Sequence, residues 1–139
     1  MKPIRTFAGA CALALPLLFP AAVAGQSAGE VPEAVWSNPD GSVHIRSYSC
    51  DGKLCGRVTW ANEEAKRDAR EGGTESLVGT NLFRNFTQQP SGAWEGEVFV
   101  PDLGKRFSGT IRFEGDTLSA EGCAALGIIC KSQRWTRVE

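Results

Sequence analysis

The stretch that decides the fold is WEGEVFVPDLGKRFSGTIRFEGDTLSA, residues 94–120. Apolar or small residues alternate with polar ones in three short runs, at 94–100, 106–113 and 118–121. The turn sequences PDLG and EGD separate these runs. A period of two with one apolar side predicts antiparallel strands that bury one face.

The same period continues on both sides of this stretch. Further runs lie at 35–36, 43–48, 56–60, 77–86 and 131–138, which gives about eight strands. A small antiparallel sheet buries one side by closing into a barrel or by folding into a sandwich. Gly96 and Gly109 fall on the apolar side, where a curved sheet needs small residues. We therefore predict an all-β fold, a compact antiparallel barrel.

One segment, ANEEAKRDAREGG at 61–73, lacks the strand period. Its alanines recur at every fourth position, Asn62 is a suitable helix cap and Gly72 a suitable end. The segment predicts a short helix near 62–71, or else a solvated loop that crosses the barrel.

The N-terminus has the three parts of a secretory signal peptide. Lys2 and Arg5 precede an uncharged apolar run, and Ala22-Val23-Ala24 is a small-x-small cleavage site. We predict a signal peptide at 1–24 and a single domain at 25–139, periplasmic or secreted, with no transmembrane segment after cleavage. An uncleaved membrane anchor, or a lipoprotein attached at Cys11, is the alternative.

Charge argues against a nucleic-acid partner. The whole chain has a formal net charge of −1, and loss of Lys2 and Arg5 would bring it to −3. Binding to nucleic acid requires a strong positive field. Charges of both signs are also mixed along the chain.

Four cysteines would follow the signal peptide, and an even number in an exported chain indicates disulfides. Three pairings are possible. The local one, Cys50–Cys55 with Cys123–Cys130, is favoured because each pair brackets a junction between two predicted strands, where facing residues lie close enough to be bridged. Zinc knuckles and C-x-x-C redox motifs have different spacings. We expect no metal and no cofactor.

No catalytic constellation is evident. His44 is the one histidine and falls on the polar side of its strand, and no nucleophile elbow exists. The carboxylates of Asp68 and Asp102 would serve acid–base chemistry or hold calcium if they met. Otherwise Asp102 supports its PDLG turn through local backbone amides, and Asp68 pairs with Arg70 or Arg84.

Binding has better support than catalysis. Four tryptophans, at 36, 60, 94 and 135, either fill the core or line a barrel mouth. The loop AALGII, residues 124–129, is apolar although loops are normally polar. We expect it to fold inward and plug one barrel end; the alternative is contact with a lipid-like ligand or a partner. The candidate ligand-binding residues are Trp60, Trp94, Arg84, Asp68, Asp102, Leu126, Ile128 and Ile129.

Several motifs resemble those of the exported bacterial domain-of-unknown-function family 2147. They are Val35-Trp36, CDGKLCGRVTW (50–60), RDAREGGTESLVGTNLF (67–83), WEGEVFVPDLGKRFSGTI (94–111) and GCAALGIICKSQRW (122–135). The family's usual Asp-then-Asn-Pro segment is replaced by Gly72-Gly73, as in a cysteine-containing subgroup. The resemblance implies a lipocalin-like barrel in the periplasm or outside the cell, and no reaction.

These observations favour a periplasmic binding module for a small apolar or amphipathic ligand or an envelope component. The alternative is a packed barrel that supports protein interactions or the envelope stress response through its surface. A small hydrolase that uses loop carboxylates is a third hypothesis. An eight-stranded barrel is just wide enough either to be filled by side chains or to hold one small ligand, so a cavity separates the first two.

Overall fold

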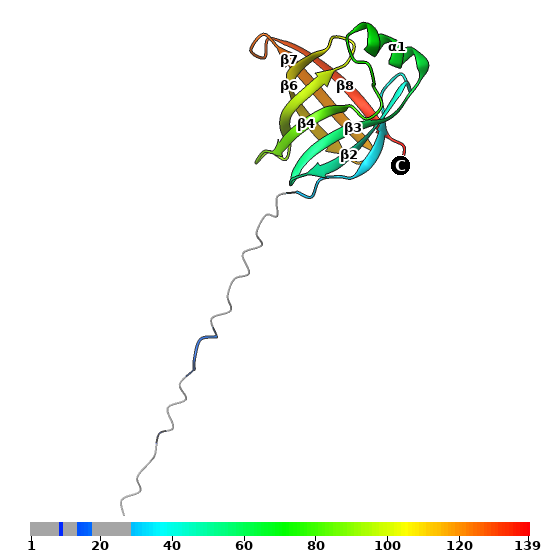
Figure 1. Cartoon of the computed structure of the whole chain (residues 1–139). Helices are drawn as coiled ribbons and strands as arrows, with labels where there is room; N and C mark the ends of the chain where they lie inside the picture. The colour runs from blue at the N-terminus through cyan, green and yellow to red at the C-terminus, as the bar shows by residue number, and fades with distance from the viewer. Residues whose placement is uncertain (1–8, 10–13, 18–28) are drawn as a thin grey trace, which may run out of the picture.

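The computed structural model describes residues 9, 14–17 and 29–139 (Figure 1). The predicted signal peptide, residues 1–24, lies outside the described residues except for 9 and 14–17, so it stays a prediction. Within the described part of the chain, no helix combines the length and the apolar character needed to span a bilayer.

Eight antiparallel strands form a closed barrel in which each strand pairs with the next and β1 also pairs with β8. The predicted fold class is confirmed, including the short helix, which lies between the third and fourth strands. The elements are β1 (Ala34–Ser37), β2 (Val43–Cys50), β3 (Lys53–Ala61), α1 (Glu63–Glu71), β4 (Asn81–Gln88), β5 (Trp94–Val100), β6 (Lys105–Glu114), β7 (Thr117–Ala124) and β8 (Ile129–Arg137).

The two ends of the barrel differ (Figure 1). The lower end, as drawn, carries the β2–β3 turn, the β4–β5 loop and the incoming segment 29–33. The upper end carries α1, the β5–β6 turn and the β7–β8 turn, which projects beyond the strands around it.

Helix α1 is fixed at both of its termini. The side chain of Asn62 accepts a hydrogen bond from the backbone N–H of Ala65 at 2.8 Å, which is an N-cap. Gly72 follows the helix, and a side chain there would collide with the backbone carbonyl of Asp102 in the β5–β6 turn. Glycine is therefore required at 72 because two backbones meet there.

The centre of the barrel is filled by side chains. Gly96, Gly109 and Gly122 pair with one another across β5, β6 and β7. The ring of Phe86 lies over Gly96 and Gly109, and a Cβ atom on Gly96 would come within 2.7 Å of its Cγ. Phe83 covers Gly56 in the same way, at 2.6 Å. The glycines thus provide the space that two buried aromatic rings occupy.

A buried serine ties β1 to β2. Ser47 is fully buried, and its Oγ accepts hydrogen bonds from Trp36 Nε1 at 2.9 Å and from the backbone N–H of Ala34 at 3.2 Å. It also donates to the carbonyl of Pro32. A polar side chain at this depth is tolerated because its hydrogen bonds are made within the protein.

A β-bulge corrects the predicted facing of Trp60. The alternation at 56–60 placed Trp60 on the same side as Gly56 and Val58. In the structure His44 pairs with Trp60 but Ile45 pairs with Val58, so one extra residue is inserted in β3. The indole is turned outward, 46% exposed, and lies 4.8 Å from the ring of His44.

Candidate functional site

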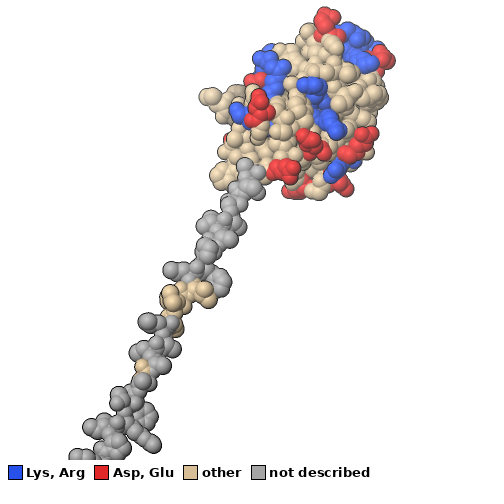
Figure 2. All heavy atoms as spheres, turned by 60° about the horizontal axis from the view of Figure 1, so that its bottom comes forward, with Lys and Arg blue, Asp and Glu red and all other residues tan. Residues whose placement is uncertain are grey.

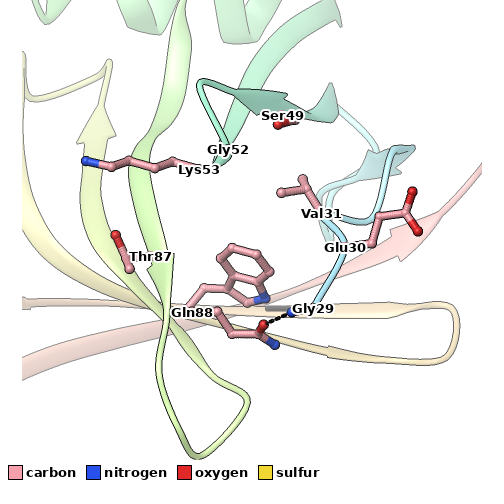
Figure 3. A pocket seen from close by; sticks show the side chains of 9 residues that line it. Gly29, Glu30, Val31, Ser49, Gly52, Lys53, Thr87 and Gln88 are labelled. Atoms are coloured by element: carbon pink, nitrogen blue, oxygen red, sulfur yellow. Dashed lines mark hydrogen bonds between the residues drawn. The ribbon is translucent and has the colours of Figure 1, made fainter. Parts of the chain in front are cut away.

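A pocket of about 350 Å³ lies at the lower end of the barrel (Figure 3). Three parts of the chain meet there: the incoming segment, the β2–β3 turn with the strand ends beside it, and the β4–β5 junction. The lining residues are Gly29, Glu30, Val31, Ser49, Gly52, Lys53, Thr87, Gln88 and Trp94.

The walls of this pocket are held in place by local contacts. The side-chain oxygen of Gln88 accepts a hydrogen bond from the backbone N–H of Gly29, which draws the incoming segment across the barrel end (Figure 3). The backbone of Gly29 lies so close to the end of the Gln88 side chain that a side chain at 29 would displace it. On the opposite wall, Asp51 and Gly52 have φ values of 53° and 78°, the combination of a tight hairpin turn.

The pocket combines an apolar surface with uncharged polar groups. Trp94, 4% exposed, and Val31, which packs against the core, provide its apolar surface. In Figure 3 the charged groups of Lys53 and Glu30 point away from it on opposite sides. The polar groups that face it come from Ser49, Thr87 and Gln88, none of which is charged. This lining suits an apolar body with an uncharged hydrogen-bonding group.

A second hollow, of about 480 Å³, lies along Glu30, Val31, Pro32 and Glu33. It shares Glu30 and Val31 with the first pocket, so both belong to the surface of the incoming segment. Among the residues that the structure describes, its lining comes from this single stretch, whereas the first pocket brings together three parts of the chain.

The described surface around the lower end has no large patch of charged side chains of a single sign in the view of Figure 2. Lys, Arg, Asp and Glu side chains are interspersed across the view in Figure 2. This distribution agrees with the mixed charges of the sequence.

The two tryptophans chosen from the sequence are at different ends. Trp94 begins β5 and lines the pocket at the lower end. Trp60 lies near the end of β3, beside α1 at the upper end, and faces solvent. The structure therefore does not bring Trp60 and Trp94 into one site.

The structure does bring Asp68 and Asp102 near each other. Partial burial, and then the charge of Asp68, raise the pKa of the Asp102 carboxyl above its usual value. Across residues 29–139 neither carboxylate forms an ion pair. Within the described part of the chain, the Asp102 side chain also makes none of the hydrogen bonds to backbone amides that were expected of it. The turn is held instead by backbone hydrogen bonds from the Leu103 N–H to the Val100 carbonyl and from the Gly104 N–H to the Pro101 carbonyl, both at 3.2 Å.

Arg84 is not the partner of Asp68. It lies in β4 opposite Glu97, and Glu97 instead pairs with Arg106 at 3.3 Å. The Nε atom of Arg84 is buried and has no hydrogen-bond partner among the described residues. The candidates Asp68, Asp102 and Arg84 thus form no shared site with Trp94.

The expectation that AALGII plugs the barrel is wrong. Leu126, Ile128 and Ile129 are 104%, 83% and 62% exposed. The loop turns away from the barrel because Phe83 and Phe86 already fill its interior. The alternative, an exposed contact surface, is the arrangement that the structure contains.

Both disulfides follow the local pairing. Cys123 and Cys130 are directly opposite in the β7–β8 ladder, with Cα atoms 4.1 Å apart. Cys50 and Cys55 are diagonal, because Cys55 pairs with Tyr48, and their Cα atoms are 5.9 Å apart. The carboxylate of Glu121 lies beside Cys123 and Cys130, but sulfur atoms in a disulfide are not available as metal ligands.

A family model described as an uncharacterized protein conserved in bacteria (DUF2147) matches residues 34–137. The chain belongs to this family. The match spans the whole barrel from β1 to β8. No curated protein and no solved structure matches the chain significantly. The DUF2147 assignment confirms the resemblance found in the sequence motifs, and the two disulfides agree with a cysteine-containing subgroup.

Sequence reasoning found Trp94 but missed the rest of the pocket. Val31 and Gln88 lie 57 positions apart and meet only because the incoming segment crosses the barrel end. The signal available in the sequence is Asp51-Gly52, a dipeptide typical of tight hairpin turns, and this turn forms one wall.

Proposed function

We propose that this DUF2147 protein is an exported binding module that takes one small amphipathic molecule at the lower mouth of its barrel. The observation that carries the proposal is the pocket over Trp94, at the end of a barrel whose centre is filled. Its volume of about 350 Å³ is at the small end of the range for ligand pockets. The ligand would place an apolar group against Trp94 and Val31, and an uncharged polar group near Gln88.

Export is part of this proposal. It is supported by the signal-like sequence at 1–24 and by two disulfides, which persist in oxidising compartments. The proposed location is the periplasm or the extracellular space. N-terminal sequencing of the protein from the envelope fraction should begin at Gly25, and a chain that begins at Met1 would contradict cleavage.

The binding proposal is tested with N-phenyl-1-naphthylamine, a neutral fluorescent probe that has an apolar body and one N–H donor. We expect a fluorescence increase that saturates at one probe per chain and changes little with salt, because the pocket presents no charge. Replacing Val31 with Trp should fill the pocket and weaken binding at least tenfold, or about 1.4 kcal/mol.

The matched control is Ile128→Lys, which removes apolar surface at the upper end only. If this variant abolishes probe binding and Val31→Trp retains it, the pocket is not the binding site. Native mass spectrometry of protein purified gently from the envelope complements the test: a non-covalent mass that disappears on denaturation would identify the class of ligand.

A second candidate function rests on a different observation. The exposed side chains of Leu126, Ile128 and Ile129 form an apolar tip of a kind that marks contact surfaces. The protein would then act by binding another envelope protein through this tip. Ile128→Lys should abolish capture of such a partner without loss of stability, while Val31→Trp should leave capture unchanged.

A further inference from the structure

Strand β8 has a free edge. It pairs with β7 over its length, but β1 reaches it only at Thr136 and Arg137. Along residues 129–135, no strand among the described residues lies on the other side. The four residues from Lys131 to Arg134 are all exposed. The barrel is thus closed by a short seam between β1 and β8, and the rest of β8 extends beyond it without a strand on that side among the described residues.

The hydrogen-bonding direction along this edge follows from the ladder. Arg137 donates its N–H to Asp116, on the β7 side, and Val138 donates its N–H to Val35, on the β1 side. Because successive residues of a strand alternate in direction, the N–H and C=O groups of Cys130, Ser132 and Arg134 point to the open side. Unpaired backbone groups of this kind form a template for another strand.

We propose that this edge pairs with the same edge of a second copy of the chain, antiparallel, about a twofold axis at Ser132. The free stretch of seven residues, 129–135, is symmetric about Ser132. In this register Ser132 faces its own symmetry mate and Cys130 faces Arg134. All three edge residues of each chain then exchange N–H and C=O groups with the other chain, so no edge group in this stretch is left unpaired.

The side chains support the same register. Lys131 falls opposite Gln133 of the second copy, so no two like charges face each other. The Oγ of Ser132 donates to the carboxylate of Glu121 at 3.1 Å, which holds that negative charge beside the open edge. Arg134 of the second copy lies diagonally across from Ser132, within the reach of a long side chain. Two such Glu121–Arg134 contacts would form, one on each side of the axis.

The apolar tip lies beyond the paired stretch. At Thr136 and Val138 the same side of β8 is occupied by β1, through the Ser37–Thr136 pair and the hydrogen bond from the Val138 N–H to the Val35 carbonyl. The strand pairing between the two copies is therefore confined to residues 129–135, and Leu126 and Ile128 take no part in it.

The first test is the mass in solution as a function of protein concentration, measured by analytical ultracentrifugation. We expect a reversible dimer of twice the chain mass. Ser132→Pro should abolish it, because proline removes an edge N–H that β7 does not use and is tolerated on an open strand side. Ser132→Ala, which keeps the N–H, should retain the dimer. A protein that stays monomeric at every concentration overturns the proposal.

A charge exchange keeps the test decisive if the proline variant fails to fold. Glu121→Arg and Arg134→Glu should each weaken dimerisation, by roughly five- to tenfold, since each puts like charges together across the axis. The double variant should recover most of the affinity. If the double variant dimerises no better than either single variant, or if Ser132→Pro folds and still dimerises, the contact lies elsewhere on the protein.

Discussion

Two disulfide-bonded hairpins with opposite characters occur in the same barrel. The β2–β3 hairpin has a polar turn, its Leu54 is fully buried, and it forms one wall of the pocket. The β7–β8 hairpin has an apolar turn, and its tip is exposed beyond the barrel. Each has one disulfide near its turn, so the cross-link alone does not determine whether a hairpin packs.

The turn residues show what the difference means. The β2–β3 turn places Asp51 and Gly52 at left-handed φ values, and these residues tolerate that conformation. The β7–β8 turn places Ala125 and Leu126 there, at 51° and 57°. Alanine and leucine are disfavoured in this region, and the leucine is fully exposed as well. Residues that oppose both conformation and solvation indicate a contact function for this hairpin.

The largest expected difference in stability is between truncating a large apolar side chain in the β2–β3 hairpin and truncating one in the β7–β8 hairpin. Leu54→Ala should lower the free energy of unfolding by about 3 kcal/mol, because it removes a fully buried side chain. Ile128→Ala should change it by less than about 0.5 kcal/mol, because the side chain is 83% exposed. Chemical denaturation measures both; a comparable loss for the two variants would remove the distinction.

The disulfides should also differ, although their loops are of similar length. Loop closure alone gives each about 2 to 2.5 kcal/mol. Cys50→Ala with Cys55→Ala should cost about 3 kcal/mol, since Cys55 is also buried. Cys123→Ala with Cys130→Ala should cost only about 1 kcal/mol, because the projecting tip regains freedom while the barrel stays folded. Thermal unfolding of the two double variants measures these losses of stability. Equal losses would contradict the expected difference between the two disulfides.

Exchanging turn residues sharpens the comparison further. Leu126→Asn should raise stability by about 0.5 to 1 kcal/mol, because asparagine tolerates the left-handed region and removes exposed apolar surface. Asp51→Leu makes the reverse change in the other turn and should lower stability by about 1 kcal/mol. A Leu126→Asn variant that is less stable than the parent would show that the apolar turn serves the fold.

The smallest expected effect is a pH dependence of stability. It arises in the β5–β6 turn, which lies beside the β7–β8 hairpin at the upper end. Because the pKa of Asp102 is raised, the folded protein holds more protons than the unfolded chain between the ordinary carboxyl value and the raised one. Stability should therefore fall as pH rises through that interval and stay level above it.

Asp102→Asn should remove this fall and give a small gain at neutral pH, and Asp68→Asn should reduce it. Unfolding curves across the acidic range measure the slope. If stability instead rose with pH in the parent and this rise were absent from Asp102→Asn, the pKa of Asp102 would be lowered in the folded protein, which contradicts the account.

The sequence predicted the barrel because the period of two is a local property. Gly96 and Gly109 were recognised as interior positions, and Asn62 and Gly72 as helix boundaries, from neighbours within a few residues. Trp60 was placed on the wrong side because a single-residue bulge at 59 reverses the facing of the residues after it.

The parts that could not be predicted depend on distant contacts. The loop 124–129 was expected inside the barrel because it is apolar, but the available volume is taken by Phe83 and Phe86 from β4. The pocket depends on a hydrogen bond between Gly29 and Gln88, for which no local pattern exists. The open edge of β8 follows from the shortness of β1, which the sequence showed only as Val35-Trp36.

Amide hydrogen exchange in a dilute solution tests the central contrast between the hairpins most directly. In β3, Leu54, Gly56 and Arg57 pair with strands on both sides, so their amides should all be strongly protected. In β8, the amides of Lys131 and Gln133 should be protected and those of Cys130, Ser132 and Arg134 should exchange rapidly. Uniform protection along 130–134 under dilute conditions would show that this edge is covered within a single chain and would contradict the account.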